Sequence, residues 1–227
     1  MAKNRNKRKK SSGGAPVKLP PQKYIQTRAR KLPFYKCFVN TDWDDTGMAI
    51  VIVSRQQGGD KLVVGLYLVD TWCLGLKDTH YHFRMDNFEF DNDLLLDIYN
   101  SKHLEVKEID SEYAQNIIYG AIEYAEDLGF SPHKDFKLTE YILDPSDSIE
   151  VIDLEFGKDG MPLYVNGLND NVEKIIATLE RNVGLGNFHY TIGGQTFGEY
   201  DDDDFEEEED FEDNDDDFAE DITYEEV

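Results

Sequence analysis

Charge is segregated so strongly along this chain that only its middle can build a hydrophobic core. Residues 1–31 hold eleven Lys and Arg and no Asp or Glu, whereas residues 199–227 hold nineteen Asp and Glu and no Lys or Arg. The middle, 32–198, has twelve basic and 29 acidic residues, a net charge of −17. Highly charged segments with few apolar residues cannot offset the entropy of ordering. We therefore predict a disordered basic head at 1–32, one folded domain at 33–198 and a disordered acidic tail at 199–227.

The first half of the middle segment is rich in strand patterns. Apolar runs of strand length lie at 34–40, 48–53 and 62–69. The tripeptide Gly58-Gly59-Asp60 predicts a turn that joins the last two runs into an antiparallel hairpin. After residue 76, apolar and polar residues alternate as far as Arg84, which is typical of a half-exposed strand.

The second half favours helices. They are predicted at 92–99, 111–128, 172–181 and from Ser131 to just before Pro145. The apolar residues of 111–128 recur at intervals of three and four, so they form one apolar stripe. Further short strands are predicted at 149–156, 163–165 and 188–192. Because the strands cluster instead of alternating with helices, we predict an α+β fold with a mixed, mainly antiparallel sheet and about four helices.

The cysteine spacing and the hydropathy of the chain argue against a cysteine metal site, a secreted protein and a membrane-spanning protein. Cys37 and Cys73 do not have the spacing of metal ligands, and the basic start of the chain runs into Ser and Gly instead of an apolar leader. No window approaches the roughly 18 apolar residues that a membrane span requires. We expect a cytoplasmic protein with reduced thiols, no membrane association and no cofactor.

Functional groups are concentrated just after the strand predicted at 62–69. The catalytic candidates there are Asp70, Cys73, Lys77 and Asp78. A Cys nucleophile needs a nearby His and a lowered pKa, and none of the five His is identifiable as that partner. Cys73 lies between Trp72 and Leu74, which favours the alternative that it is a small buried hydrophobic residue.

Two histidines indicate a possible metal site. His80 and His82 are two residues apart on a predicted strand, so both side chains point to one face, together with Asp78. His133 or Asp135 would have to complete such a site. The favoured alternative is a pair of exposed strand histidines. If a divalent metal did bind, it would activate water in a metal-dependent hydrolase or nuclease. The residues of that alternative function are Asp70, Asp78, His80 and His82.

The acidic turn Asp42-Trp43-Asp44-Asp45 is a second possible cation site. Its carboxylates are the ligands that Mg²⁺ prefers. Asp residues also favour turns because they bond to their own backbone, and the spacing differs from the twelve-residue calcium loop. We favour the structural interpretation of this turn.

The charged ends predict partners. Phe205, Phe211, Phe218 and Tyr224 interrupt the acidic residues at intervals of 6, 7 and 6. Such a composition is typical of disordered interaction segments, and the basic head has the composition of a nucleic-acid-binding arm. We therefore expect a non-catalytic interaction or regulatory protein whose tails recruit a protein or a nucleic acid.

Three stretches resemble sequences shared by a family of uncharacterised bacterial proteins. They are LVDTWCLGLKD at 68–78, GAIEYAEDLGFSPH at 120–133 and FGKDGMP at 156–162. The resemblance spans residues 34–183 and implies a bacterial origin and a single domain. It implies no role for any of the candidate site residues.

Overall fold

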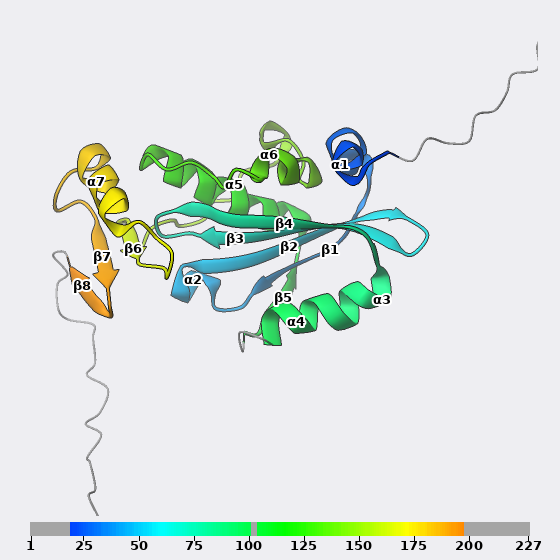
Figure 1. Ribbon diagram of the computed structural model, residues 1–227, viewed down its shortest axis with the longest axis horizontal. Helices are drawn as coiled ribbons and strands as arrows, with labels where there is room; N and C mark the ends of the chain where they lie inside the picture. Colours follow the sequence, from blue (N-terminus) through cyan, green and yellow to red (C-terminus); the bar gives the residue numbers. More distant parts are fainter. Residues whose placement is uncertain (1–18, 101–103, 198–227) are drawn as a thin grey trace, which may run out of the picture.

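The computed structural model describes residues 19–100 and 104–197, and a five-stranded sheet lies at its centre (Figure 1). Its strands, in spatial order, are β4 (Gly75–Asp86), β3 (Lys61–Asp70), β2 (Met48–Gly58), β1 (Phe34–Asn40) and β5 (Val106–Ile109). All neighbouring strands of this sheet are antiparallel. The predicted α+β class is therefore confirmed.

The central hairpin forms where the sequence predicts it. β2 and β3 pair from Met48↔Asp70 to Gln56↔Leu62, and the turn contains Gly58 and Gly59 at positive φ. Side chains alternate along β2, so Val51 and Val53 enter one core cluster while Ile52 enters another. Both faces of this strand are buried, which explains its continuous apolar sequence.

Three helices cover one face of the sheet. They are α1 (Pro21–Arg28), α5 (Ser111–Asp127) and α6 (Phe136–Thr139), which lie on the same side of the sheet in Figure 1. The apolar stripe predicted on α5 packs there, with Ile117 and Ile118 fully buried against Val51 and Val63. This face contains the largest core cluster of the described residues.

A single helical segment crosses the opposite face. It consists of α3 (Asn87–Glu89), a π-helical stretch (Phe90–Leu94) and α4 (Leu95–Asn100). The Asp86 carboxylate caps its start by accepting the Phe88 backbone N–H at 3.0 Å. Phe90 and Tyr99 bury their rings in a second core cluster on the sheet. The helix predicted at 92–99 thus exists and begins earlier.

A small second sheet packs at one end of the molecule (Figure 1). It contains β6 (Leu163–Val165), β7 (His189–Ile192) and β8 (Gln195–Phe197), and α7 (Val172–Asn182) precedes β7. β6 and β7 are parallel, so the protein contains both strand arrangements. A third core cluster includes Cys73 from the β3–β4 turn and Tyr164 from β6, which joins the two sheets.

The structure places part of the predicted basic head inside the fold. α1 lies within residues 1–32, and its Ile25 is completely buried, as is Ala29 just after it. Arg30 also donates hydrogen bonds to the carbonyl oxygens of Leu143 and Glu140. Most other residues of α1 are exposed to solvent, so a few apolar side chains are enough to pack this helix against the core. Residues 1–18 and 198–227 lie outside the described residues.

Two predicted elements differ in the structure. Residues 149–156 form no strand: Val151 is 87% exposed, and Asn116 of α5 bonds to the backbone at Glu150 and Ile152. The helix predicted after Ser131 shortens to α6 and a 3₁₀ turn at Glu140–Ile142. In both places the local sequence pattern predicted more regular secondary structure than the chain adopts against the helices on the α5 face of the sheet.

Candidate functional site

The Asp70 carboxylate organises the turn between β3 and β4. Its Oδ1 accepts the backbone N–H groups of Trp72 at 3.1 Å and Cys73 at 2.9 Å. Complete burial raises the pKa of Asp70 to about 6, and the Lys77 ammonium opposes part of this rise. The side chain is thus used to satisfy backbone donors that would otherwise be buried without partners.

Cys73 has the surroundings of a core residue. It is fully buried in the third core cluster with Leu128, Tyr164 and Phe188. Burial raises the pKa of the Cys73 thiol well above its usual range, so the thiol stays protonated at neutral pH. Because the thiolate is the nucleophile, these surroundings support the buried-hydrophobe alternative and not catalysis.

Lys77 reaches across to the second sheet. Its Nζ lies 3.2 Å from Oδ2 of Asp170, and the same oxygen accepts the Gly167 backbone N–H at 2.8 Å and the Tyr164 hydroxyl at 3.3 Å. Asp70 and Lys77 line a small cavity of about 230 Å³ beside this junction. Asp170 was missing from the sequence candidates, because only the fold brings it near Lys77, 93 positions earlier. The cluster ties the two sheets together.

The candidate metal ligands are only partly brought together. Asp78, His80 and His82 share one face of β4, as predicted, and His80 Nε2 lies 3.0 Å from Asp78 Oδ2. His133 Nδ1 lies 3.7 Å from Asp78 Oδ1 and 3.9 Å from the Asp135 carboxylate. Within residues 19–100 and 104–197, no group of three or more His, Cys, Asp or Glu side chains is placed to hold a metal ion.

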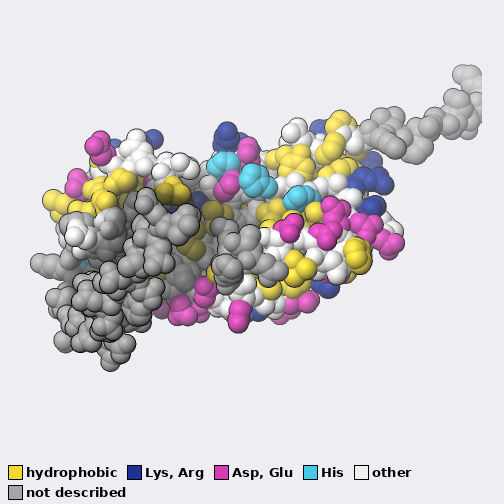
Figure 2. All heavy atoms as spheres, turned by 60° about the horizontal axis from the view of Figure 1, so that its bottom comes forward, with side chains coloured by type: hydrophobic (Ala, Val, Ile, Leu, Met, Phe, Trp, Pro, Cys, Tyr) yellow, Lys and Arg dark blue, Asp and Glu magenta, His cyan; other side chains and the backbone are white. Residues whose placement is uncertain are grey.

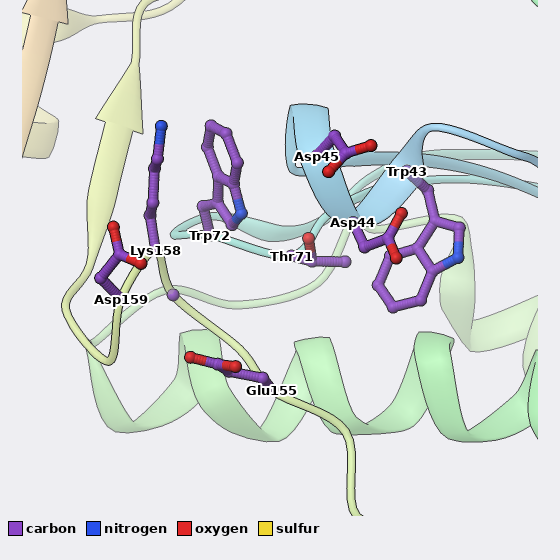
Figure 3. A pocket seen from close by; sticks show the side chains of 9 residues that line it. Trp43, Asp44, Asp45, Thr71, Trp72, Glu155, Lys158 and Asp159 are labelled. Carbon is purple, nitrogen blue, oxygen red and sulfur yellow. The ribbon is translucent and has the colours of Figure 1, made fainter. Parts of the chain in front are cut away.

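The acidic turn contributes to a shallow, polar pocket of about 340 Å³ (Figure 3). Asp44 and Asp45 lie on one side of it, and Asp159 lies on the other beside Lys158. Lys158 Nζ is 5.2 Å from the centre of the Trp72 ring, a cation–π contact. The carboxylates therefore surround the pocket without converging on one point.

An apolar hollow lies on the sheet face that carries α4. This groove of about 520 Å³ lies over β2, β3 and β4, beside α4. Its apolar lining is formed by Ile50, Leu66, Leu68, Leu94 and Ile98. Asp78, His80 and His82 lie at its β4 edge. On the face seen in Figure 2, hydrophobic side chains lie among histidine and acidic ones.

Alternating burial along β2 and β3 explains the floor of the groove. Ile50, Leu66 and Leu68 share one face of paired strands, since Ile50 is opposite Leu68 and Leu66 is opposite His80. All three are half-buried, whereas their neighbours Ala49, Tyr67 and Val69 are fully buried on the other face. The groove is thus a part of the sheet that α4 leaves uncovered.

Comparisons with known proteins add no assignment. No protein-family model, curated protein or solved structure matches this chain. The resemblance to a bacterial family therefore stays a prediction. In the part of the chain that the structure describes, no helix is long and apolar enough to cross a membrane.

Proposed function

We propose that this chain is a non-catalytic interaction protein that binds an apolar segment of a partner protein in the groove beside α4. The observation that carries the proposal is the half-buried, apolar lining of this groove on the surface of the sheet. Open apolar grooves are the usual docking sites of amphipathic protein segments.

The state of the catalytic candidates supports the same proposal. Asp70 is committed to the backbone of its turn, Cys73 to a core cluster and Lys77 to Asp170. Each of these three side chains thus has a structural role in the fold. The alternative, a metal-dependent hydrolase or nuclease, needs Asp70 beside His80 and His82, whereas Asp70 is buried and both histidines are exposed.

The charged ends extend the proposal. The head and the tail carry opposite charge, and each would attract a partner of the complementary sign. In this proposal the groove supplies specificity through shape and apolar contact, and the ends raise the rate of encounter.

The groove is tested with a labelled helical peptide of about 18 residues, five turns, that has a leucine stripe and a glutamine polar face. We expect saturable binding to the full chain by fluorescence anisotropy and at least tenfold weaker binding to Leu68→Gln. Leu66→Gln is the second groove variant. The control is Leu168→Gln, because Leu168 is 105% exposed and lies outside the groove.

Thermal unfolding establishes that each variant is folded before its affinity is compared. Equal binding by the full chain, both groove variants and the control would disprove the groove as the docking site. Absence of binding to the full chain would disprove the proposed function.

A further inference from the structure

The uncovered part of the sheet has the dimensions of one missing helix. Strands lie about 4.8 Å apart, so the five strands span about 19 Å between the axes of the outer two. A helix with its side chains is roughly 10 Å across, so two helices are needed to cover such a face. The opposite face has α1, α5 and α6, whereas on this face the described residues supply only the segment from α3 to α4.

The groove lies where a second helix would pack. Leu94 of the π-helical stretch and Ile98 of α4 form one wall of it, and Leu66 and Leu68 form the floor from β3. A helix placed there would contact the sheet below it and α4 beside it, which completes the second layer of the fold. An extended segment would fill less of this width, because it has no broad apolar face.

Acidic side chains beside the groove favour a helix with basic residues as its occupant. Two carboxylates flank the groove residue Leu94 along the helical segment: Asp93 directly precedes it, and Asp97 follows it by three residues, the spacing of neighbours on a helix surface. Both side chains are exposed, and neither forms an ion pair with another described residue. Asp78 lies at the opposite edge.

The net charge of the whole domain also favours a basic occupant of the groove. Residues 32–198 carry a net charge of −17, which attracts a basic segment and repels an acidic one. The chain's own tail, with nineteen acidic residues at 199–227, is thus a poor electrostatic match for the groove despite its aromatic residues.

We infer that the groove receives a basic amphipathic helix of a partner protein, with its apolar stripe on Leu66 and Leu68 and its cations toward Asp93 and Asp97. This inference rests on the proposed function and names the class of partner. The cations would contact carboxylates that the described residues leave unpaired, while the apolar stripe would cover the exposed part of the sheet.

Three peptides that share one leucine stripe test the inference, with lysine, glutamine or glutamate on the polar face. With the full chain at about 0.1 M salt, we expect the lysine peptide to bind about tenfold more tightly than the glutamine peptide and the glutamate peptide to bind most weakly. Asp93→Asn/Asp97→Asn should weaken the lysine peptide about threefold to fivefold and leave the glutamine peptide unchanged. Circular dichroism should show that the bound peptide becomes helical.

The matched control is Glu173→Gln/Glu180→Gln, which removes two exposed carboxylates on α7, away from the groove. All variants keep the acidic tail, so its attraction for lysine peptides cancels in the comparison. If the glutamine peptide binds and Leu68→Gln abolishes this, but lysine brings no gain or the Asp variants lose nothing, the inference is wrong and the proposed function stands. Tightest groove binding by the glutamate peptide would instead identify an acidic occupant, and a bound peptide without helix would exclude a helical one.

Discussion

The two faces of the five-stranded sheet are built from the same strands and differ in how far they are covered. On the face of α1, α5 and α6, residues such as Val51, Val63 and Ile117 have no exposed surface. On the face of α4, Leu66 and Leu68 of β3 are only partly buried. Buried apolar area stabilises the fold, whereas exposed apolar area is available to a partner. Both faces thus contain a buried core cluster, but only the α4 face also leaves part of its apolar surface open to a partner.

Removal of α1 should destabilise the covered face more than any other change considered. Deletion of residues 1–31 removes the buried side chains of Ile25 and Ala29 and the contacts of Arg30. We expect the free energy of unfolding to fall by about 5 kcal/mol or more, since the loss of one large core side chain already costs roughly 2–5 kcal/mol. Urea unfolding measures this.

Deletion of residues 1–18 is the control, because it leaves α1 intact. Because residues 1–18 contain few apolar side chains that could be buried, we expect a change within about 0.5 kcal/mol. Equal stability of the two truncated chains would contradict the role of α1 in the core.

Single substitutions on the two faces compare them directly. Ile118→Ala empties a fully buried site on α5, so the free energy of unfolding should fall by about 4 kcal/mol. Leu68→Ala removes a side chain that is only partly buried, so the expected loss is smaller, about 1–2 kcal/mol. Similar losses in the two variants, measured by urea unfolding, would show that the groove face is packed in solution.

The Asp70 turn at the junction of the two sheets predicts a dependence of stability on pH. The folded pKa of about 6 lies above the ordinary value of 3.8. Between these values the folded state binds more protons than the unfolded state, so this group lowers stability as pH rises from about 4 to about 6. The effect amounts to about 3 kcal/mol at 1.36 kcal/mol per pH unit.

Asp70→Asn keeps the oxygen that accepts the N–H groups of Trp72 and Cys73 and removes the charge. Its stability relative to the wild-type protein should therefore increase by up to about 3 kcal/mol as pH rises from 4 to 7. Chemical unfolding at a series of pH values measures the difference. A difference that does not change with pH would show that Asp70 titrates normally.

The charged ends predict the smallest effect. If the head binds nucleic acid, the acidic tail competes for it, and deletion of residues 199–227 should tighten binding about tenfold at low salt, or about 1.4 kcal/mol. The gain should shrink as salt rises, because charges are screened over about 8 Å at physiological salt. Deletion of residues 1–18, which hold seven Lys and Arg, should abolish binding.

Anisotropy with labelled RNA and DNA at several salt concentrations decides between the outcomes. Equal binding with and without the tail would exclude competition. No binding by any of the chains would exclude a nucleic-acid-binding head and favour a protein partner.

Elements with local sequence signals could be predicted without the structure. The hairpin of β2 and β3 follows from two apolar runs and a Gly-Gly turn, and α5 follows from one apolar stripe. The shared face of His80 and His82 follows from the alternation of a strand. Each of these signals lies within a few residues of the element it describes, so no knowledge of the fold is needed.

The roles of individual side chains depend on contacts between distant segments and could not be predicted in this way. Asp70 and Cys73, which the sequence made catalytic candidates, are buried in the structure as parts of a turn and of a core cluster. The fold also brings Asp170 beside Lys77. Ile25 became a core residue although its segment is basic. The groove exists because one helical segment leaves part of a sheet face uncovered. Whether a sheet face is covered depends on where segments distant in the sequence pack, and local sequence patterns do not predict that packing.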